Sequence, residues 1–104
     1  MIKKIEKYSA EWCGPCKVLG KTLELVLKDF PGIELIEFDA DENEKEFEEK
    51  SIRNVPQLFF YNEEGNEVHH LTGAYPANKL KDIIDYHNQT KEDYDPNQKY
   101  EENE

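Results

Sequence analysis

The first 38 residues read as a strand, a helix and a second strand, and this order narrows the choice of folds. Residues 1–9 predict a short strand. Between Cys13 and Phe30 the apolar residues recur at steps of three and four, which marks one helix face, and Pro31-Gly32 ends the helix. Residues 33–38 are rich in β-formers and too few for a helix. A strand–helix–strand start implies two parallel strands joined by a right-handed crossover.

The rest of the chain adds an antiparallel edge to that pair. Residues 41–51 predict a very polar helix with Phe47 as its main apolar anchor. Residues 57–61 form a nearly continuous apolar strand, and residues 67–72 return as its hairpin partner. Pro76 suits the first turn of a last amphipathic helix. The expected fold is α/β: a four-stranded mixed sheet, in the order β-α-β-α-β-β-α, flanked by three helices.

The charge balance excludes several classes of partner. The chain has 104 residues, 13 basic and 24 acidic side chains, and a formal net charge of −11. Nucleic acids and anionic membranes both need a basic surface, so neither is expected. No apolar run approaches the ~20 residues that span a bilayer, and no apolar stretch of a secretory signal follows the N-terminal lysines. We therefore expect a cytoplasmic protein.

The acidic excess is concentrated near the C-terminus. Residues 89–104 carry six acidic and two basic side chains and no aliphatic one. Such a segment cannot bury enough surface to offset the entropy of ordering. We expect a folded domain over residues 1–88 and an acidic, disordered tail over residues 89–104.

The segment Trp12-Cys13-Gly14-Pro15-Cys16 carries the sharpest chemical signal, at the junction of a predicted strand and helix. At a helix N-terminus, unpaired backbone N–H groups and the helix dipole would stabilise a Cys13 thiolate, which is the nucleophilic form. Cys16 lies about one turn further on, with its Cα ~5 Å away, within the range for a disulfide. Pro15 needs no N–H partner in the first turn.

Two other roles for the cysteines remain open at this point. Zinc usually takes four ligands, and the only histidines are His69, His70 and His87. Adjacent residues of a strand point to opposite faces, so His69 and His70 cannot easily share one ion. Inert structural thiols are the second alternative, although thiols at helix starts tend to be reactive.

Residues 10–17 resemble the active-site signature of the thioredoxin family, and the resemblance continues at residues 38–41, 54–61 and 73–74. It covers residues 2–88. It implies a thioredoxin-like fold and a dithiol–disulfide oxidoreductase that reduces protein disulfides. Cys13 would attack the substrate disulfide, and Cys16 would resolve the mixed disulfide. No bound cofactor is implied; a thioredoxin reductase would restore the dithiol with electrons from NADPH.

The resemblance also implies a substrate groove. Pro56 would be a cis-proline that faces the two sulfurs, and it would leave the Val55 backbone free to pair with an extended substrate. The alternative for Pro56 is a plain strand-initiating proline. The residues expected to line the groove are Trp12, Gly14, Pro15, Val55, Pro56, Gly73 and Ala74.

One departure from the family concerns charge near the sulfurs. The family's buried aspartate, six residues before the first cysteine, is replaced by Lys7, and its usual lysine partner, counted back from Pro56, by Glu37. We infer a swapped pair in which Glu37 accepts the proton of Cys16 and Lys7 is its charge partner. Because a lysine favours thiolate, we expect a less reducing couple than in an ordinary thioredoxin. The alternative is that both side chains face water.

Other departures affect the surface. The family's usual first strand and helix have no counterpart before residue 2, so we expect one sheet face to be partly uncovered. We expect a monomer, with a dimer as the alternative. In place of the family's helix-kinking proline the chain has Lys21, beside Gly20, so the helix is straight or mildly bent.

Alternative functions are a redox-independent binding module or a glutaredoxin-like or oxidising relative.

Overall fold

The computed structural model describes residues 1–88, and the predicted acidic tail, residues 89–104, lies outside the described residues. Seven elements follow the predicted order of strands and helices. They are β1 (Ile2–Ser9), α1 (Gly14–Leu27), β2 (Glu34–Asp39), α2 (Glu44–Glu49), β3 (Gln57–Asn62), β4 (Glu67–Thr72) and α3 (Ala77–His87).

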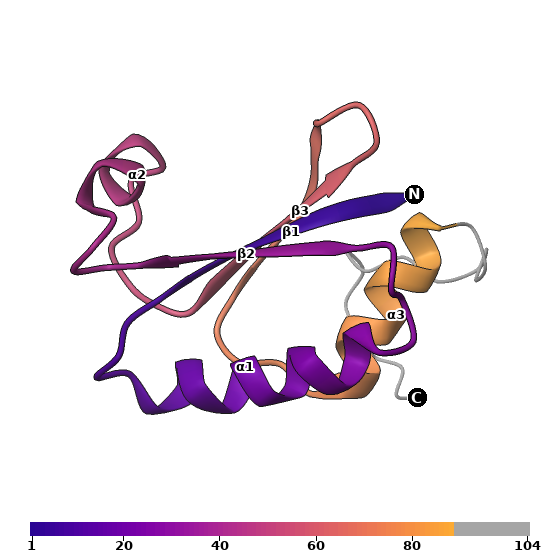
Figure 1. The fold of residues 1–104 in the computed structure, drawn as a ribbon, viewed down its shortest axis with the longest axis horizontal. Coiled ribbons are helices and arrows are strands. Elements are labelled where there is room, and N and C mark those ends of the chain that lie inside the picture. The colour runs from indigo at the N-terminus through magenta and orange to yellow at the C-terminus, as the bar shows by residue number, and fades with distance from the viewer. Residues whose placement is uncertain (89–104) are drawn as a thin grey trace, which may run out of the picture.

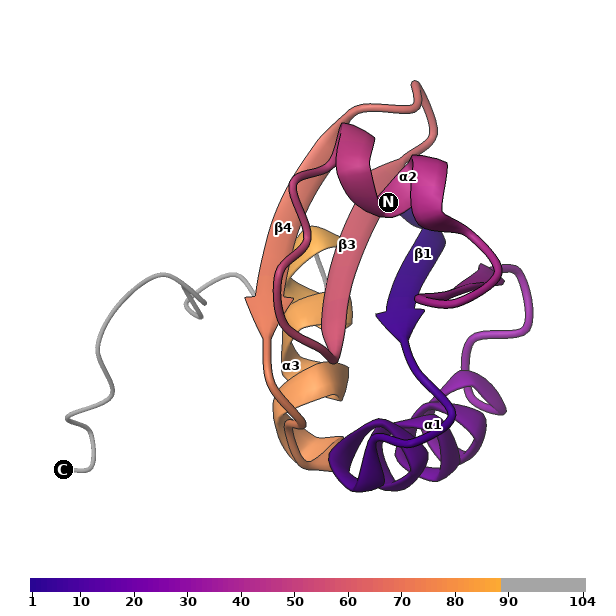
Figure 2. The same cartoon turned by 90° about the vertical axis from the view of Figure 1, so that its left-hand side faces the viewer.

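The strands form one mixed sheet in the order β2-β1-β3-β4 (Figure 1). β1 runs parallel to β2 and antiparallel to β3, and β3 and β4 form the hairpin. The predicted fold class is therefore confirmed. α1 and α3 pack on one face of the sheet and α2 on the other (Figure 2). None of the helices among residues 1–88 has the length and apolar character needed to cross a membrane.

The main core lies between the sheet and the pair α1 and α3. Its residues come from one face of each helix and from inward positions of the central strands, as the sequence periodicity requires. The largest fully buried side chains are Ile5, Leu19, Leu23, Leu58, Phe60, Leu80, Ile83 and Ile84. This core fixes the start of α1, and with it the two cysteines, against the end of β1.

The opposite face holds a smaller aromatic cluster that is covered by α2. Tyr8 stacks on Phe38 and meets Phe47 and Phe59 edge to face. α2 itself has no buried residue, so Phe47 and the following Lys50 attach it to the sheet. The helix is shorter than the predicted range 41–51, because a single apolar anchor holds it.

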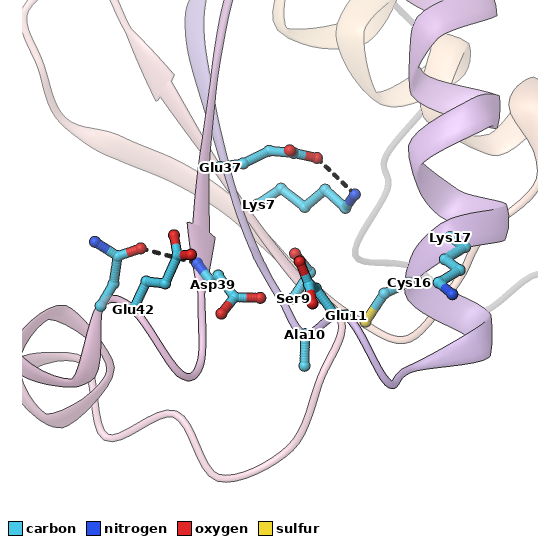
Figure 3. Close-up of a pocket in the computed structure, with 10 residues that line it drawn as sticks. Lys7, Ser9, Ala10, Glu11, Cys16, Lys17, Glu37, Asp39 and Glu42 are labelled. Atoms are coloured by element: carbon cyan, nitrogen blue, oxygen red, sulfur yellow. Dashed lines mark hydrogen bonds and ion pairs between the residues drawn. The ribbon is translucent and has the colours of Figure 1, made fainter.

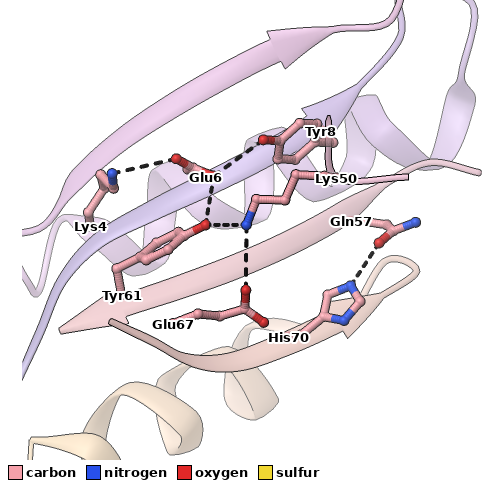
Figure 4. A network of polar contacts seen from close by, with 8 residues as sticks. All are labelled: Lys4, Glu6, Tyr8, Lys50, Gln57, Tyr61, Glu67 and His70. Carbon is pink, nitrogen blue, oxygen red and sulfur yellow. Dashed lines mark hydrogen bonds and ion pairs between the residues drawn. The ribbon is translucent and has the colours of Figure 1, made fainter. Parts of the chain in front are cut away.

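A polar network continues across this face (Figure 4). The Lys50 ammonium lies 4.1 Å from the centroid of the Phe59 ring and donates to the Tyr61 hydroxyl. The Tyr61 hydroxyl donates to Glu6 at 3.0 Å, and Glu6 pairs with Lys4. Burial, followed by the Glu6 carboxylate, raises the pKa of Tyr61 well above its ordinary value. The tyrosine therefore stays protonated and can donate to Glu6 throughout the physiological range.

Candidate active site around two cysteines

Cys13 and Cys16 form a disulfide at the N-terminal end of α1, with their Cα atoms 5.3 Å apart. β1 ends at Ser9, and a turn in which the Cys13 amide donates to the Ala10 carbonyl leads into the helix. Cys13 occupies the N-cap position, and the amide of Cys16 donates to the Cys13 Sγ at 3.1 Å. The helix start thus directs an N–H group at one sulfur and places the second sulfur one turn away.

The two cysteine residues differ little in burial, but their neighbours differ. Cys13 is 6% and Cys16 2% exposed. Gly14 and Pro15 between them are exposed, and the Trp12 side chain is 70% exposed beside them. Cys13 therefore lies at the edge of an accessible surface, whereas Cys16 faces inward.

The loop before β3 closes over Cys13. The Val55–Pro56 peptide bond is cis, and the Val55 carbonyl oxygen lies 4.0 Å from the Cys13 Sγ. Pro56 is buried, and its carbonyl accepts a hydrogen bond of 2.9 Å from the amide of Gly73. Gly73 has a φ of +106°, which a side chain would disfavour. This contact joins Gly73, which the exposed Ala74 follows, to the loop that carries Val55 and Pro56.

A cavity of about 580 Å³ opens beside Cys13. The predicted residues Trp12, Gly14, Pro15 and Val55 form part of its lining. The remaining lining residues were not predicted from the sequence: Ala40, Phe47, Ile52, Arg53 and Asn54. They come from α2 and the segments around it, and the sequence indicated only that Phe47 anchors a helix.

A second cavity, of about 370 Å³, lies behind Cys16 (Figure 3). Lys7 and Glu37, which the register of β1 and β2 sets side by side, both line it. The Lys7 Nζ donates to the Glu37 Oε2 at 2.7 Å. Lys7 is 5% exposed, but the Glu37 side chain is 56% exposed. The inferred pair is therefore present, but it is buried on the lysine side only, because β2 is an edge strand of the described sheet.

Gly20 has a role at this site that the sequence did not indicate. A Cβ built at Gly20 would lie 2.9 Å from the Lys7 Nζ. The glycine leaves space on α1 for the end of a buried lysine. α1 is one continuous helix across this position. The useful signal would have been a glycine inside a helix that faces a lysine on a buried strand.

The histidines do not gather around the cysteines. His69 is buried and His70 is exposed, as expected for neighbours on a strand. Within residues 1–88, no three or more histidine, cysteine or acidic side chains come together in a way that could hold a metal ion.

Comparisons with known proteins agree on one family. The thioredoxin family model matches residues 3–86. Thioredoxin from Mycoplasmoides gallisepticum is 32% identical over 82 residues, which cover 79% of this chain and 81% of the relative. Among solved structures, thioredoxin from Fasciola hepatica has a TM-score of 0.71 and 31% identity, covering 81% of this chain and 79% of its own. Oxidised thioredoxin from Plasmodium falciparum has a TM-score of 0.70 and 32% identity, with the same coverage.

The matched region contains both cysteines and all of the described sheet except Ile2, so the likeness extends to the chemistry of the disulfide. Proteins of this kind exchange a cysteine pair with the disulfides of other proteins and bind no cofactor. The protein is accordingly a dithiol–disulfide oxidoreductase that acts as an electron carrier to protein disulfides. This chain belongs to the thioredoxin family.

Proposed function

We propose that Cys13 is the attacking sulfur and Cys16 the resolving sulfur in the reduction of protein disulfides. The observation that carries this assignment is the hydrogen bond from the Cys16 amide to the Cys13 Sγ at the N-cap of α1. Such a donor stabilises negative charge on Cys13, and the accessible cavity opens beside this residue.

The electrons and protons balance over two exchanges. The Cys13 thiolate attacks one sulfur of the substrate disulfide, forms a mixed disulfide and releases the first substrate thiolate. Cys16, after losing its proton, attacks the Cys13 sulfur and releases the second substrate thiolate. The substrate gains two electrons and two protons, and the protein is left with the Cys13–Cys16 disulfide. The 5.3 Å between the two Cα atoms makes the second step intramolecular and fast.

The substrate would lie in the groove between Trp12 and the Val55–Pro56 loop. An extended segment could pair with the Val55 backbone, as a strand adds to a sheet edge. Gly14 and Pro15 would form the floor next to Cys13, and Gly73 and Ala74 would bound the other side. This assignment is supported by the contact of the Val55 carbonyl with Cys13 and by the hydrogen bond between Gly73 and Pro56.

Glu37 is the proton acceptor for Cys16 in this scheme, and Lys7 is its charge partner. Both line the same cavity as Cys16, and the exposure of Glu37 lets it pass a proton on to water. The positive charge of Lys7 favours thiolate over disulfide. The couple should therefore be less reducing than that of a thioredoxin with an aspartate at this position.

The cellular setting follows from the same chemistry. A thioredoxin reductase, with electrons from NADPH, would return the disulfide to the dithiol in the reducing cytoplasm. Residues 1–88 would act as a monomeric redox domain, with residues 89–104 as an acidic extension. The net charge of −11 supports a soluble carrier with no affinity for nucleic acid.

Trapping tests the assignment of the two sulfurs. A Cys16→Ser variant can form the mixed disulfide but cannot resolve it, so it should accumulate a covalent adduct with an oxidised protein substrate. The matched Cys13→Ser variant should accumulate none. An adduct that forms through Cys16 in the Cys13→Ser variant, and not through Cys13, would reverse the two roles.

A further inference from the structure

A chain of hydrogen bonds connects the exposed face of β4 to the loop that closes over Cys13. The His70 Nε2 lies 2.7 Å from the Gln57 Oε1 (Figure 4). The Gln57 Nε2 donates to the Asn54 carbonyl and to the Asn54 Oδ1, each at 3.0 Å. Asn54 directly precedes Val55 and Pro56 and lines the cavity beside Cys13.

The chemistry of these groups fixes the direction of each bond. Both Asn54 atoms are acceptors, so Gln57 must turn its amide nitrogen toward them and its oxygen toward His70. An oxygen that accepts there requires a hydrogen on the His70 Nε2. If the Gln57 amide were flipped, its oxygen would face the two Asn54 oxygens, and three acceptors would meet without a hydrogen between them. The Asn54 oxygens therefore set the orientation of the Gln57 amide, and His70 supports this orientation by donating to the Gln57 oxygen.

Packing holds the side chains of His70 and Gln57 in place. The His70 ring stacks on the Phe59 ring, with 4.2 Å between centroids and 9° between planes. Gln57 is only 7% exposed, whereas Asn54 is exposed. Besides the backbone bond from Gly73 to Pro56, the exposed loop is thus tied to the sheet through one buried amide, whose oxygen contacts His70 on the neighbouring strand.

We propose that His70 and Gln57 are positioning residues, which hold Asn54 and the Val55 backbone in the geometry that receives an extended substrate segment. The proposal rests on the substrate groove assigned above. Neither side chain lines the cavity beside Cys13, so neither acts on the sulfurs directly. Their loss should therefore affect substrates that use the Val55 backbone and spare small disulfides that do not.

The test compares two oxidants of the reduced full-length protein. One is a peptide with a single intramolecular disulfide, and the other is bis(2-hydroxyethyl) disulfide, which has no peptide backbone. The rate of each reaction is read from Trp12, the only tryptophan, and from free thiols. His70→Phe keeps the ring on Phe59 but removes the donor, and the exposure of His70 favours an intact fold.

The expected result is a selective loss. His70→Phe should lower the second-order rate constant for the peptide by about two- to tenfold, the range of one lost hydrogen bond, with no change for the small disulfide. His70→Gln, which restores a donor, should recover most of the rate. Gln57→Glu, which replaces the donating amide by a carboxylate oxygen, should show the same selective loss as His70→Phe. Thr72→Val, two residues along the same face of β4, is the matched control and should behave as wild type.

Two results would overturn the proposal: equal peptide rates in wild type and His70→Phe, or an equal loss with both oxidants, which would show an effect on Cys13 or on folding. Failure of the proposed function looks different. In that case the wild type itself would reduce the peptide no faster than a free thiol does.

Discussion

Gly20 lies directly opposite the ammonium group of Lys7, since a Cβ at position 20 would come within 2.9 Å of the Lys7 Nζ. Lys7 is at the same time 2.7 Å from Glu37 and lines the cavity behind Cys16. A missing side chain on α1 is thus matched to a buried charge on β1. A shift of the ammonium would change its distance to Glu37 and its position in the cavity behind Cys16.

A double-mutant cycle measures this fit. Alanine is favoured over glycine in a helix interior by about 1 kcal/mol. Gly20→Ala should therefore raise the free energy of unfolding by about 1 kcal/mol in a Lys7→Ala background, where no ammonium fills the space. In the presence of Lys7 the gain should be clearly smaller or reversed, because the end of the lysine must move. Urea unfolding of the four proteins checks this, and an equal gain in both backgrounds would contradict the contact.

The charge of Lys7 should set part of the redox potential. A Lys7→Gln variant loses a positive charge behind Cys16, so thiolate is less favoured and the disulfide more favoured. We expect a potential lower by about 10–30 mV, where 30 mV corresponds to 1.4 kcal/mol. Equilibration with glutathione buffers, followed through Trp12, measures it.

Lys21→Gln is the control for the change in net charge, because Lys21 is exposed on α1, the helix that carries Cys16. Its potential should equal that of the wild type, since an exposed charge is screened by solvent. Equal shifts of the redox potential in both variants would mean that the net charge of the protein, and not the position of Lys7, sets the potential.

The fold was predictable because its signals are local. The apolar periodicity of α1 and the continuous apolar run of β3 each specify an element, and the order of elements limits the topology. The contact between Lys7 and Glu37 was expected from the family resemblance, which places a charged pair at these two positions, and the register of β1 and β2 sets the residues side by side. The bounds of α2 were wrong, because its ends depend on tertiary contacts of Phe47 and Lys50 and not on a repeating pattern.

The rest of the site depends on packing that no short pattern encodes. The one-sided burial of the Lys7–Glu37 pair results from the position of β2 at the edge of the described sheet. Gly20 acquires its role only when α1 crosses over β1. The hydrogen bonds from His70 through Gln57 to Asn54 connect β4 to a loop through a buried glutamine. None of these three residues is part of a sequence pattern that would predict the connection.

Removal of the Glu37 carboxylate should slow the second exchange. A Glu37→Gln variant loses this acceptor for the proton of Cys16, but water and the other carboxylates of the open cavity, Glu11, Asp39 and Glu42, can replace it in part. We expect the resolution of the mixed disulfide to slow by about tenfold, less than the 10²–10⁴ typical of an enclosed general base. Rapid acid quenching of the mixed disulfide gives this rate. Glu34→Gln, exposed on the same strand, is the control, and equal rates in wild type and Glu37→Gln would exclude the role.

His87 should make stability depend on pH. Its Nε2 is buried without a hydrogen-bond partner in the described structure, next to the ring of His69. Burial, and then the charge of the N-terminus, lowers the pKa of His87 from the ordinary 6.5. The unfolded chain therefore binds this proton at a higher pH than the native protein does. The contribution of His87 to stability is complete above pH 6.5 and decreases as the pH falls below it.

Replacement of His87 by leucine should remove this part of the pH dependence. Leucine continues the apolar face of Leu80, Ile83 and Ile84, so the variant should fold. Urea unfolding at pH 7.5 and 5.5 gives the comparison, because all other titrating groups are common to both proteins. The free energy of unfolding of the wild type should fall more than that of His87→Leu, by at most about 1.4 kcal/mol per pH unit below 6.5. Parallel pH profiles would mean that His87 accepts a proton as readily in the native protein as in the unfolded chain. This result would contradict the burial of the His87 imidazole.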